Sequence, residues 1–429
     1  MYNLMKVGVV LTAIISCAST ASEPVRASAK LKPFFLGQHI LYLTSYSAVT
    51  NEMFSGVRIW ANEGTTWAQI ESQPRKFDFS KLDSNVAQAQ SNGFDIIYTL
   101  GQTPAWASAR PAEKGNTGLG AAAEPANMQD WAHYVREVAQ RYKGRISGYE
   151  IMNEPRIPDA VKLWSPGFFS GSSNVLATMT RIAAEEIKKI DQSTLVICPA
   201  MDGAEQGLKR LDQFLSTGAG AYCDVIGFHY YLRTLSTTEL RSLIKATKLL
   251  MAKHGLQGRP LWDTETGILI AEAGHNLVPK EKTGPLSKMF DSPEASRFAA
   301  QFLIISYISG VERTYWFAHD TSWMGSTVAD KRLNQLNSFG KAMTLINSWL
   351  SGRTVEDCVD AAMDMNCRVL AQGNWIGNVY WGEGKTIDEW KNLGFKSIGF
   401  LNSEVLHLEN SDGTAVLPRI QDDVIFLTR

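Results

Sequence analysis

The chain has 429 residues, enough for one large domain with a sizeable core and a smaller second domain. Its 43 acidic and 42 basic residues nearly cancel, so no strong net field would attract nucleic acid or an anionic membrane surface. The sequence therefore predicts no nucleic-acid partner. Its 12 Trp, 13 Tyr and 18 Phe residues supply many flat rings, which fill protein cores and also suit the C–H faces of sugars.

The N-terminus predicts an export signal. Lys6 precedes an apolar run at residues 7–15, which is too short to span a bilayer, and small residues follow it. Two endings of the signal remain open. Ile14-Ile15-Ser16-Cys17 resembles a bacterial lipobox, which would make Cys17 a lipid anchor to a membrane, whereas Ser19-Thr20-Ala21 suits ordinary cleavage. Either ending predicts an exported protein that is periplasmic, secreted or an outer-membrane lipoprotein.

Four further cysteines would remain in the exported chain. Cys358 and Cys367 could close a small hairpin loop as a disulfide in an oxidising compartment. Cys198 and Cys223 lie at or beside predicted strands, and we expect them to be buried thiols. The chain contains neither a CxxC pair nor an HExxH motif. The sequence therefore predicts no metal site and implies no cofactor.

Short apolar runs predict eight strands, at residues 34–41, 56–60, 95–100, 145–151, 194–198, 224–229, 260–265 and 313–317. Capped or amphipathic segments predict helices at residues 80–92, 127–143, 175–190, 208–215, 238–254, 293–309 and 333–350. Apolar strands that alternate with helices are typical of a parallel sheet covered on both faces. Eight such repeats predict a (β/α)8 TIM barrel, and an open doubly wound sheet is the alternative.

Connection lengths indicate which end of the barrel carries a site. The helix-to-strand turns are short, whereas the long connections at residues 101–126, 155–174, 266–292 and 318–332 all leave from strand C-termini. That end is where barrels of this type build their active sites.

The pattern changes after residue 350, where β-like segments separated by Gly and Asn/Asp turns predict a small antiparallel unit. The expected organisation is a signal peptide at 1–21, a linker at 22–33, a catalytic barrel at 34–350 and a small β-sandwich-like domain at 351–429.

Two acidic motifs end the fourth and seventh predicted strands: Asn153-Glu154-Pro155 and Thr264-Glu265-Thr266-Gly267. Pro155 cannot donate to a strand ladder and biases Glu154 toward an extended or turn conformation. In an eight-stranded barrel these two strands lie roughly across the mouth from each other. Facing carboxylates about 5–5.5 Å apart are what retaining glycoside hydrolysis requires. The alternative is that both are ordinary loop-edge acids in salt bridges.

The motifs resemble those of the retaining (β/α)8-barrel glycosidases of glycoside hydrolase clan A. Within that clan, residues 67–71, 77–79 and 103–106 make the chain most similar to family 39 and bacterial exopolysaccharide hydrolases, and it is also similar to family 5. The resemblance covers the barrel. It implies that Glu154 is the acid/base and Glu265 the nucleophile of a β-glycosidase that acts on an oligosaccharide or polysaccharide.

The same resemblance suggests substrate-binding roles at other strand ends. Arg58 would hydrogen-bond near the nucleophile and keep it ionised, and Asn153 would contact the sugar 2-hydroxyl. His229 and Tyr231 match a pair that places an imidazole near the sugar and a phenol near the nucleophile. Trp316 would be the platform under the sugar. The alternatives are a structural ion pair for Arg58, a structural role for His229 and a core position for Trp316.

Five residues on the long connections could line outer subsites or only pack the loops down: Trp106, Trp164, His319, Asp320 and Trp323. Strand alternation places Asp263 on the same side as Glu265, where it would tune that carboxylate or make a core polar contact. The expected protein is a monomeric hydrolase that works by double displacement. A transglycosylase, a catalytically inactive carbohydrate-binding protein and an envelope structural lipoprotein are the alternatives.

Overall fold

The structure of the protein is a computed structural model. The structure describes residues 32–45, 52–158, 160, 167–232, 236–271, 289–321, 324, 328–330, 335–361, 364–382, 385–411 and 423–429. The expected signal peptide at 1–21, nearly all of the linker at 22–33, Trp164 and Trp323 lie outside these residues. Among the described helices, none combines the length and apolar character that a membrane-crossing segment needs.

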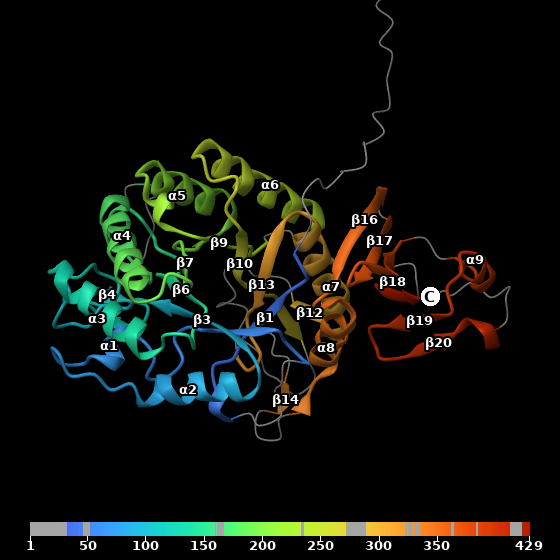
Figure 1. The fold of residues 1–429 in the computed structure, drawn as a ribbon, viewed down its shortest axis with the longest axis horizontal. Helices are drawn as coiled ribbons and strands as arrows, with labels where there is room; N and C mark the ends of the chain where they lie inside the picture. Colours follow the sequence, from blue (N-terminus) through green and yellow to red (C-terminus); the bar gives the residue numbers. More distant parts are fainter. Residues whose placement is uncertain are drawn as a thin grey trace, which may run out of the picture.

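A curled parallel sheet forms the centre of the molecule, with the strand order β7-β6-β3-β2-β1-β13-β10-β9-β8 (Figure 1). Its strands are β1 (Leu36–His39), β2 (Gly56–Ile59), β3 (Asp95–Leu100), β6 (Gly148–Ile151), β7 (Leu195–Ile197), β8 (Met201–Asp202), β9 (Ile226–His229), β10 (Leu261–Thr266) and β13 (Val311–Trp316). The eight predicted strands are all present, and the structure is a (β/α)8 barrel.

The fifth strand of the barrel is interrupted. β7 and β8 are separated by residues 198–200, which include Pro199, and a proline has no N–H group for a strand ladder. β7 pairs with β6, and β8 pairs with β9. Single bridges from Asn153 to Ala200 and from Ile197 to Val225 connect the two halves to their neighbours. The barrel therefore closes across this interruption.

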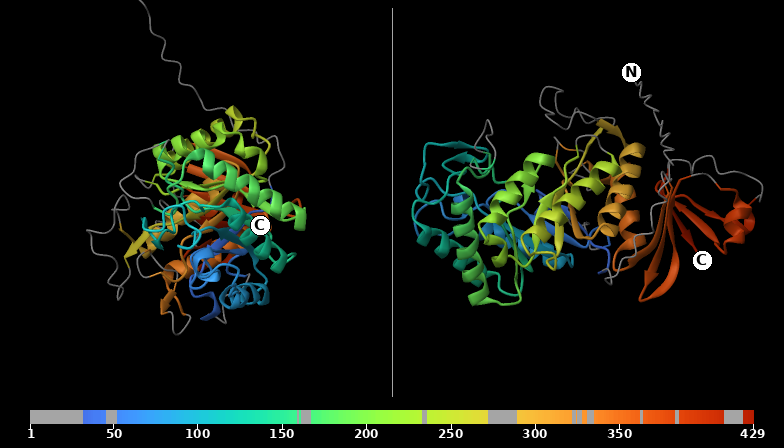
Figure 2. Two further views of the ribbon diagram at one scale, coloured as in Figure 1. Left: turned by 90° about the vertical axis from the view of Figure 1, so that its left-hand side faces the viewer. Right: turned by 90° about the horizontal axis from the view of Figure 1, so that it is seen from above.

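Helices surround the barrel: α2 (Ser80–Ser91), α3 (Met128–Arg141), α4 (Ser173–Ile190), α5 (Ala204–Ser216), α6 (Thr237–Lys253), α7 (Ser292–Ile308) and α8 (Ser338–Leu350) (Figures 1 and 2). Several begin at a side-chain cap, as when Ser172 accepts from the backbone of Val175 and Ser236 from that of Glu239. The last helix begins five residues later than predicted, because Asn337 caps it and residues 335–336 pair with residues 328–330.

Two apolar clusters define the inside and the outside of the barrel. The inner cluster joins residues from strands all around the sheet, which can meet only in the lumen: Ile97, Ile197, Val225, Trp262 and Tyr315. The outer cluster lies between the strands and the surrounding helices. Because Tyr315 and Trp262 point into the lumen, their neighbours Trp316 and Asp263 point toward the helices.

Short strand pairs occupy the long connections at the C-terminal end of the barrel. They are β4 (Lys114–Gly115) with β5 (Gly118–Leu119), β11 (Leu269–Ala271) with β12 (Met289–Asp291), and β14 (Val328–Asp330) with β15 (Gln335–Leu336). A one-turn helix, α1 (Trp67–Ile70), was not predicted and follows β2. These additions confirm that the elaborated end of the barrel is the one where the strands end.

The C-terminal region forms one antiparallel sheet with the order β16-β17-β18-β21-β19-β20. Its elements are β16 (Thr354–Ala361), β17 (Asp364–Ala371), β18 (Asn374–Trp381), α9 (Ile387–Asn392), β19 (Ser397–Phe400), β20 (Val405–His407) and β21 (Ile425–Thr428). One face packs on the barrel, where Trp349 of α8 stacks on Phe426 with ring centroids 5.6 Å apart. The other face is covered by α9 through Trp390.

The β-sandwich-like expectation for residues 351–429 is therefore wrong. The strands carry apolar side chains on both faces, a pattern that fits a sandwich, but within the described part of this region they form one sheet, and helices cover its two faces. Figures 1 and 2 show this sheet beside α7 and α8.

Both cysteine pairs are bonded. Cys358 and Cys367 join β16 to β17 across their hairpin, as the sequence suggested. Cys198 and Cys223 also form a disulfide, with Cα atoms 5.4 Å apart, so the expectation of buried thiols is wrong. The reason is tertiary: Cys198 follows β7 and Cys223 precedes β9, and the interruption of the fifth strand brings those segments together.

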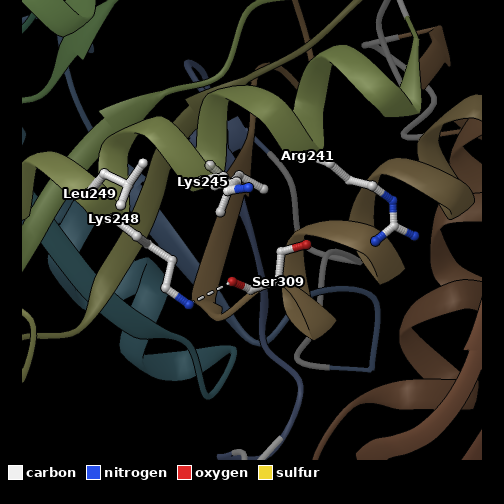
Figure 3. A pocket seen from close by; sticks show the side chains of 6 residues that line it. Arg241, Lys245, Lys248, Leu249 and Ser309 are labelled. Carbon is white, nitrogen blue, oxygen red and sulfur yellow. Dashed lines mark hydrogen bonds between the residues drawn. The ribbon is translucent and has the colours of Figure 1, made fainter. Parts of the chain in front are cut away.

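A hollow of about 300 Å³ lies on the outer side of α6, lined by Arg241, Ile244, Lys245, Lys248, Leu249 and Ser309 (Figure 3). Lys248 donates to the backbone oxygen of Ser309. Ser309 precedes β13, so the hollow lies toward the N-terminal end of that strand, opposite the end that carries the acidic motifs. Its lining includes cations and no carboxylate.

Candidate active site

Glu154 and Glu265 meet at the C-terminal mouth of the barrel. One carboxylate oxygen of each and one ring nitrogen of His229 all lie within 4.8 Å of one another. The side chains of Glu154 and Glu265 are 11% and 9% exposed, so both reach solvent from a mostly buried position. This spacing is close to the separation of about 5–5.5 Å in retaining glycosidases and below the inverting gap of about 6.5–9.5 Å.

Glu154 is held by an unusual backbone turn. Met152 and Glu154 both have positive φ angles, 65° and 41°, which non-glycine residues seldom adopt. The backbone N–H of Glu154 donates to Ala200, on the far side of the interrupted fifth strand. Pro155 then accepts a hydrogen bond at its carbonyl oxygen from buried Arg210. These contacts hold the acid in place over the lumen.

Glu265 reaches the lumen because of a β-bulge in β10. Asp263 pairs with Thr314 and Thr266 with Trp316, so two residues of β10, Thr264 and Glu265, oppose a single residue of β13. A bulge of this kind breaks strand alternation and redirects a side chain, often beside an active site. The Thr264 hydroxyl accordingly contacts the ring Nε2 of His229 at 3.1 Å. Thr264 and Glu265 therefore both face inward.

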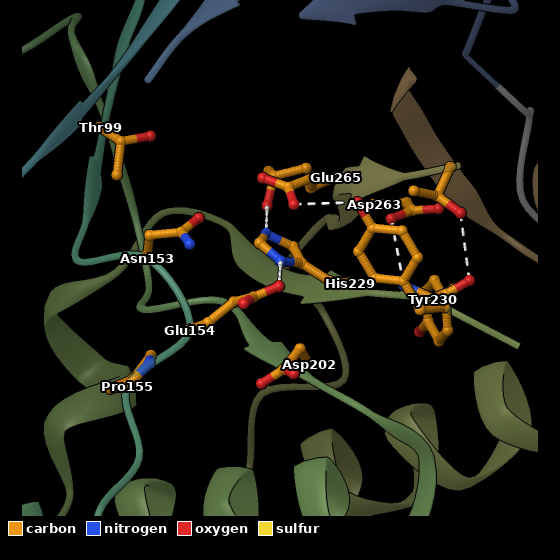
Figure 4. Close-up of polar contacts among 12 residues, drawn as sticks. Thr99, Asn153, Glu154, Pro155, Asp202, His229, Tyr230, Asp263 and Glu265 are labelled. Atoms are coloured by element: carbon orange, nitrogen blue, oxygen red, sulfur yellow. Dashed lines mark hydrogen bonds and ion pairs between the residues drawn. The ribbon is translucent and has the colours of Figure 1, made fainter. Parts of the chain in front are cut away.

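Asp263 lies on the opposite face of β10, so the expectation that it shares a side with Glu265 is wrong. Its neighbour across the ladder, Phe228, packs toward Gly207 of α5. Asp263 accepts from the backbone N–H of Tyr230 (Figure 4). Burial raises the pKa of Asp263 well above its ordinary value, which favours the neutral form of this carboxyl.

Arg58 connects the groups around Glu265. Its side chain is fully buried, and its Nη1 donates to Glu265 Oε2 at 2.6 Å. Its Nη2 donates to Asn153 Oδ1 at 2.6 Å and to Glu150 Oε2 at 2.6 Å, and its Nε donates to the same Glu150 oxygen at 3.0 Å. The guanidinium thus fixes Glu265 and Asn153 together, and Arg58 makes the contact with Glu265 that the sequence predicted.

Both carboxylate oxygens of Glu265 accept hydrogen bonds: Arg58 donates to Oε2, and the phenol of Tyr231 donates to Oε1 at 2.9 Å. Burial raises the pKa of Glu265 above its ordinary value, and the Arg58 guanidinium opposes that shift. Two donors, one of them charged, stabilise the ionised form that a nucleophile needs.

The surroundings of Glu154 are different. Burial and then the nearby charge of Asp202 raise the pKa of Glu154 to about 8, against the opposing effect of Arg156 and Arg210. Glu154 is therefore protonated at neutral pH. Its Oε1 lies 2.9 Å from His229 Nδ1 (Figure 4). Burial also lowers the pKa of His229, which favours a neutral imidazole. Its Nδ1 can then accept a hydrogen bond from the protonated carboxyl group of Glu154.

Trp316 does not face Glu154 or Glu265. It is fully buried on the helix side of the sheet, where its ring packs against Phe302 of α7 and Phe339 of α8. Its predicted position as a sugar platform is therefore wrong, because β13 alternates and Tyr315 takes the lumen side. The next residue, Phe317, returns inward: it clusters with Tyr231 and lies edge-on to His39, with ring centroids 4.7 Å apart.

Three of the residues predicted to line outer subsites instead pack the long connections against the barrel. Trp106 donates from Nε1 to the backbone oxygen of Glu71 at 2.7 Å. Asp320 accepts from the backbone N–H groups of residues 41 and 42, after β1. His319 is fully buried with its ring edge-on to Phe54, and burial lowers its pKa to about 3. None of these contacts brings the three residues to Glu154 or Glu265.

The site contains residues that the sequence reasoning missed. Glu150 lies in the middle of apolar β6, and a charged residue in such a strand was the available signal. His39, at the end of β1, is buried with Nε2 against the backbone oxygen of Trp60 at 2.8 Å. No local pattern distinguished His39, Thr264 or Phe317, because their roles depend on which strands become neighbours.

Glu154, His229 and Glu265 are close enough to hold a metal ion. Their environment does not suit one. Both Glu265 oxygens already accept hydrogen bonds, and the Arg58 guanidinium lies 2.6 Å from one of them. A divalent cation at this point would be repelled by a fully buried positive charge. The donor set fits acid/base and nucleophilic chemistry instead.

Comparisons with known proteins agree with this geometry. The family model of the cellulases, glycosyl hydrolase family 5, matches residues 37–276, a span that includes both Glu154 and Glu265. No curated protein matches the chain significantly.

Solved structures share the fold at low sequence identity. A family 39 glycoside hydrolase from the gut symbiont Bacteroides cellulosilyticus WH2 is 14% identical, with a TM-score of 0.66 over 92% of this chain and 81% of that one. A GH30 endoxylanase from Clostridium papyrosolvens C71 is 13% identical, with a TM-score of 0.58 over 94% and 98%. A monomeric beta-xylosidase from Caulobacter crescentus CB15 is 14% identical, with a TM-score of 0.57 over 82% and 76%.

Proposed function

The chain belongs to the cellulase family, glycosyl hydrolase family 5, and we propose that it is a retaining β-glycoside hydrolase with Glu265 as nucleophile and Glu154 as acid/base. The observation that carries this proposal is the pair of carboxyl groups in one site with opposite environments. Arg58 and Tyr231 donate to Glu265, whereas burial and Asp202 keep a proton on Glu154. One group is prepared to attack and the other to donate.

Two displacements follow from this arrangement. In the first, a Glu265 oxygen bonds to the anomeric carbon, the glycosidic C–O bond breaks, and the leaving oxygen takes the Glu154 proton. In the second, ionised Glu154 takes a proton from water, the water oxygen bonds to the anomeric carbon, and the ester to Glu265 breaks. Two inversions restore the starting configuration, so the product keeps the β anomer.

Asn153 is oriented for the substrate by Arg58. Since its Oδ1 accepts from the Arg58 guanidinium, its Nδ2 remains to donate to a sugar hydroxyl. We infer that this hydroxyl is the 2-OH, whose hydrogen bonds strengthen in the transition state. The aromatic ring of Phe317, beside Tyr231, is the candidate surface for the apolar face of the same sugar.

We propose an oligosaccharide or polysaccharide substrate, with bacterial exopolysaccharides as the first class to try. The long connections at the mouth, which carry the β4–β5, β11–β12 and β14–β15 pairs, support a binding region larger than one sugar. The two disulfides support an oxidising compartment, and hence export, either freely secreted or lipidated at Cys17. We also propose that the protein is a monomer.

The first prediction concerns the two glutamates. Glu265→Ala removes the nucleophile and Glu154→Ala the acid/base, and for Glu265→Ala we expect kcat/KM on an activated aryl β-glycoside to fall by more than about 1,000-fold. Azide should then separate the roles. Glu265→Ala leaves space for azide on the nucleophile's side, which gives the α-glycosyl azide. Glu154→Ala still forms the glycosyl-enzyme, so azide attacks from the opposite side and gives the β-azide.

The measurement is proton NMR of the products, with wild-type protein and a panel of aryl glycosides and exopolysaccharides. Retention of the anomeric configuration by the wild type supports the proposal. Inverted wild-type product, or turnover by Glu265→Ala near the wild-type rate, would overturn it. Adding sugar acceptors to the same reactions distinguishes hydrolysis from transglycosylation.

A further inference from the structure

A third carboxylate, Glu150, lies beneath the two catalytic ones. It is fully buried in β6, where its Oε2 accepts two hydrogen bonds from Arg58 and one from Thr99 Oγ1 at 2.7 Å. Burial raises its pKa, but the Arg58 guanidinium, with hydrogen bonds from Thr264 and Thr99, outweighs that effect, so Glu150 is ionised. A buried charge of this kind persists only where its partners are fixed.

Glu150 determines where the Arg58 guanidinium points. Two of the three guanidinium nitrogens donate to one Glu150 oxygen, and this orientation leaves Nη1 directed at Glu265 and Nη2 shared with Asn153. An arginine paired side-on in this way has little rotational freedom. The nucleophile and the amide beside it are therefore aligned from below by a residue that touches neither.

A second connection leads from Glu150 to the acid/base. The Thr264 hydroxyl lies beside Glu150 and lowers its pKa. The same hydroxyl contacts His229 Nε2, and His229 Nδ1 contacts Glu154 Oε1. Glu150 is thus the point where two polar chains meet, one through Arg58 to Glu265 and the other through Thr264 and His229 to Glu154.

Resting on the proposed function, we propose that Glu150 is a positioning residue that holds Arg58 against the nucleophile and couples the two catalytic carboxyl groups. The charged and titratable groups that face it are Arg58 on β2, His229 on β9, Tyr315 on β13 and, across Arg58, Glu265 on β10. Arg58 is the fixed cation among them and serves two carboxylates. The charge on Glu150 therefore limits how strongly Arg58 stabilises ionised Glu265.

The second prediction is a pH shift in Glu150→Gln. The amide oxygen can still accept from Arg58 and Thr99, and the amide nitrogen takes the place of Glu150 Oε1. With the negative charge gone, Arg58 faces one carboxylate, so the pKa of Glu265 falls. Activity needs ionised Glu265, so the acidic limb of the kcat/KM profile moves to lower pH, by about 1 unit.

The matched control is Asp263→Asn. Asp263 is an equally buried carboxyl, but it lies on the outer face of β10, away from the hydrogen bonds of Arg58 to Glu150 and Glu265, and burial favours its neutral form. Its profile should keep both limbs of the wild type. An acidic limb in Glu150→Gln that coincides with those of the wild type and the control would overturn the proposal, whatever the absolute rate.

A second variant separates position from charge. Glu150→Ala removes the anchor of Arg58, and we expect kcat to fall about 100-fold while KM changes less, because a misplaced catalytic group affects mainly the transition state. Glu150→Gln should recover most of this kcat. Wild-type kcat in folded Glu150→Ala would overturn the positioning role, and if Glu150→Ala does not fold, the Glu150→Gln profile decides.

The inference also has a readout that needs no turnover. The carboxyl carbon of Glu265 can be followed by carbon-13 NMR in labelled protein during a pH titration, with its signal assigned by its loss in Glu265→Gln. The titration should move to lower pH in Glu150→Gln and stay in place in Asp263→Asn. If the wild type cleaves no glycoside, the proposed function fails, and this titration still shows whether Glu150 acts on Glu265.

Discussion

Trp316 and Phe317 are adjacent aromatic residues whose rings lie on opposite sides of the barrel wall. Trp316 is held between α7 and α8, and Phe317 is held beside Tyr231 and His39. Strand alternation alone separates them, because Tyr315 occupies the lumen. The ring that can meet a sugar is therefore the smaller of the two.

The third prediction compares their alanine variants. Phe317→Ala removes an apolar surface beside Glu265 and should lower kcat/KM by about 10- to 100-fold, since burying a Phe side chain contributes about 1.5–3 kcal/mol. Trp316→Ala leaves a cavity in the outer core and should reduce the free energy of unfolding by about 3–5 kcal/mol. The measurements are kinetics on the folded enzyme and urea unfolding. Full activity in Phe317→Ala would contradict the assignment.

Glu154 and Glu265 are likewise two similar residues that differ in their surroundings, here in the charges nearby. Both are buried glutamates at strand ends, and burial raises the pKa of each. What distinguishes them is a neighbouring charge: the Arg58 guanidinium donates to Glu265, whereas the charge of Asp202 adds to the burial that raises the pKa of Glu154. Because Asp202 and Arg210 come from residues far along the chain, the motif around Glu154 could not reveal that difference.

At the scale of elements, the interruption of the fifth strand shapes this part of the barrel. β7 ends at Ile197 and β8 begins at Met201, and the residues between them provide the backbone acceptor for Glu154 and one cysteine of a disulfide. A strand without a continuous ladder loses hydrogen bonds that hold its neighbours in register. The bond between Cys198 and Cys223 offsets this loss, since it ties the ends of β7 and β9 together.

The fourth prediction follows from the loop that each disulfide closes. The Cys198–Cys223 bond spans 25 residues and the Cys358–Cys367 bond spans 9. Loop-closure entropy gives losses of about 3.5 and 2.6 kcal/mol, respectively, when the bonds are removed. Cys198→Ala with Cys223→Ala should therefore lower Tm more than Cys358→Ala with Cys367→Ala, measured by calorimetry. A larger fall in Tm for Cys358→Ala with Cys367→Ala would show that the interrupted fifth strand does not depend on the Cys198–Cys223 disulfide.

At the scale of the whole molecule, the C-terminal sheet and the barrel share one apolar core. Side chains of β16, β17, β18 and β21 belong to the cluster that also surrounds the barrel strands. The stack of Trp349 on Phe426 lies in the middle of this contact. The sheet packs on the helix side of the barrel and contributes none of the residues that contact Glu154 or Glu265 in the described structure.

The fifth prediction tests this division. Trp349→Ala should reduce the free energy of unfolding by about 2 kcal/mol through lost packing, while kcat stays within about twofold of the wild type. Val405→Ala, on the exposed edge strand β20, is the control and should change neither quantity. Chemical denaturation and steady-state kinetics provide both values. A large loss of kcat in folded Trp349→Ala would mean that the sheet acts on the active site.

The sequence by itself determined the eight strands, most helix boundaries and the elaborated end of the barrel. It also determined that Glu154 and Glu265 end two strands at that mouth. All of these depend on local features: apolar periodicity, capping residues, and motifs such as Asn153-Glu154-Pro155 that stop a strand where it ends. The hairpin disulfide between Cys358 and Cys367 belongs with them, because its two strands are consecutive.

Only the tertiary structure decided the remainder. The inward turn of Glu265 and the outward position of Asp263 depend on a register shift between β10 and β13. The bond from Cys198 to Cys223, and the position of Glu150 beneath Arg58, depend on strands distant in sequence becoming neighbours. Single-chain periodicity describes each strand in isolation, whereas these features arise from pairing between strands, and pairing is a property of the folded barrel.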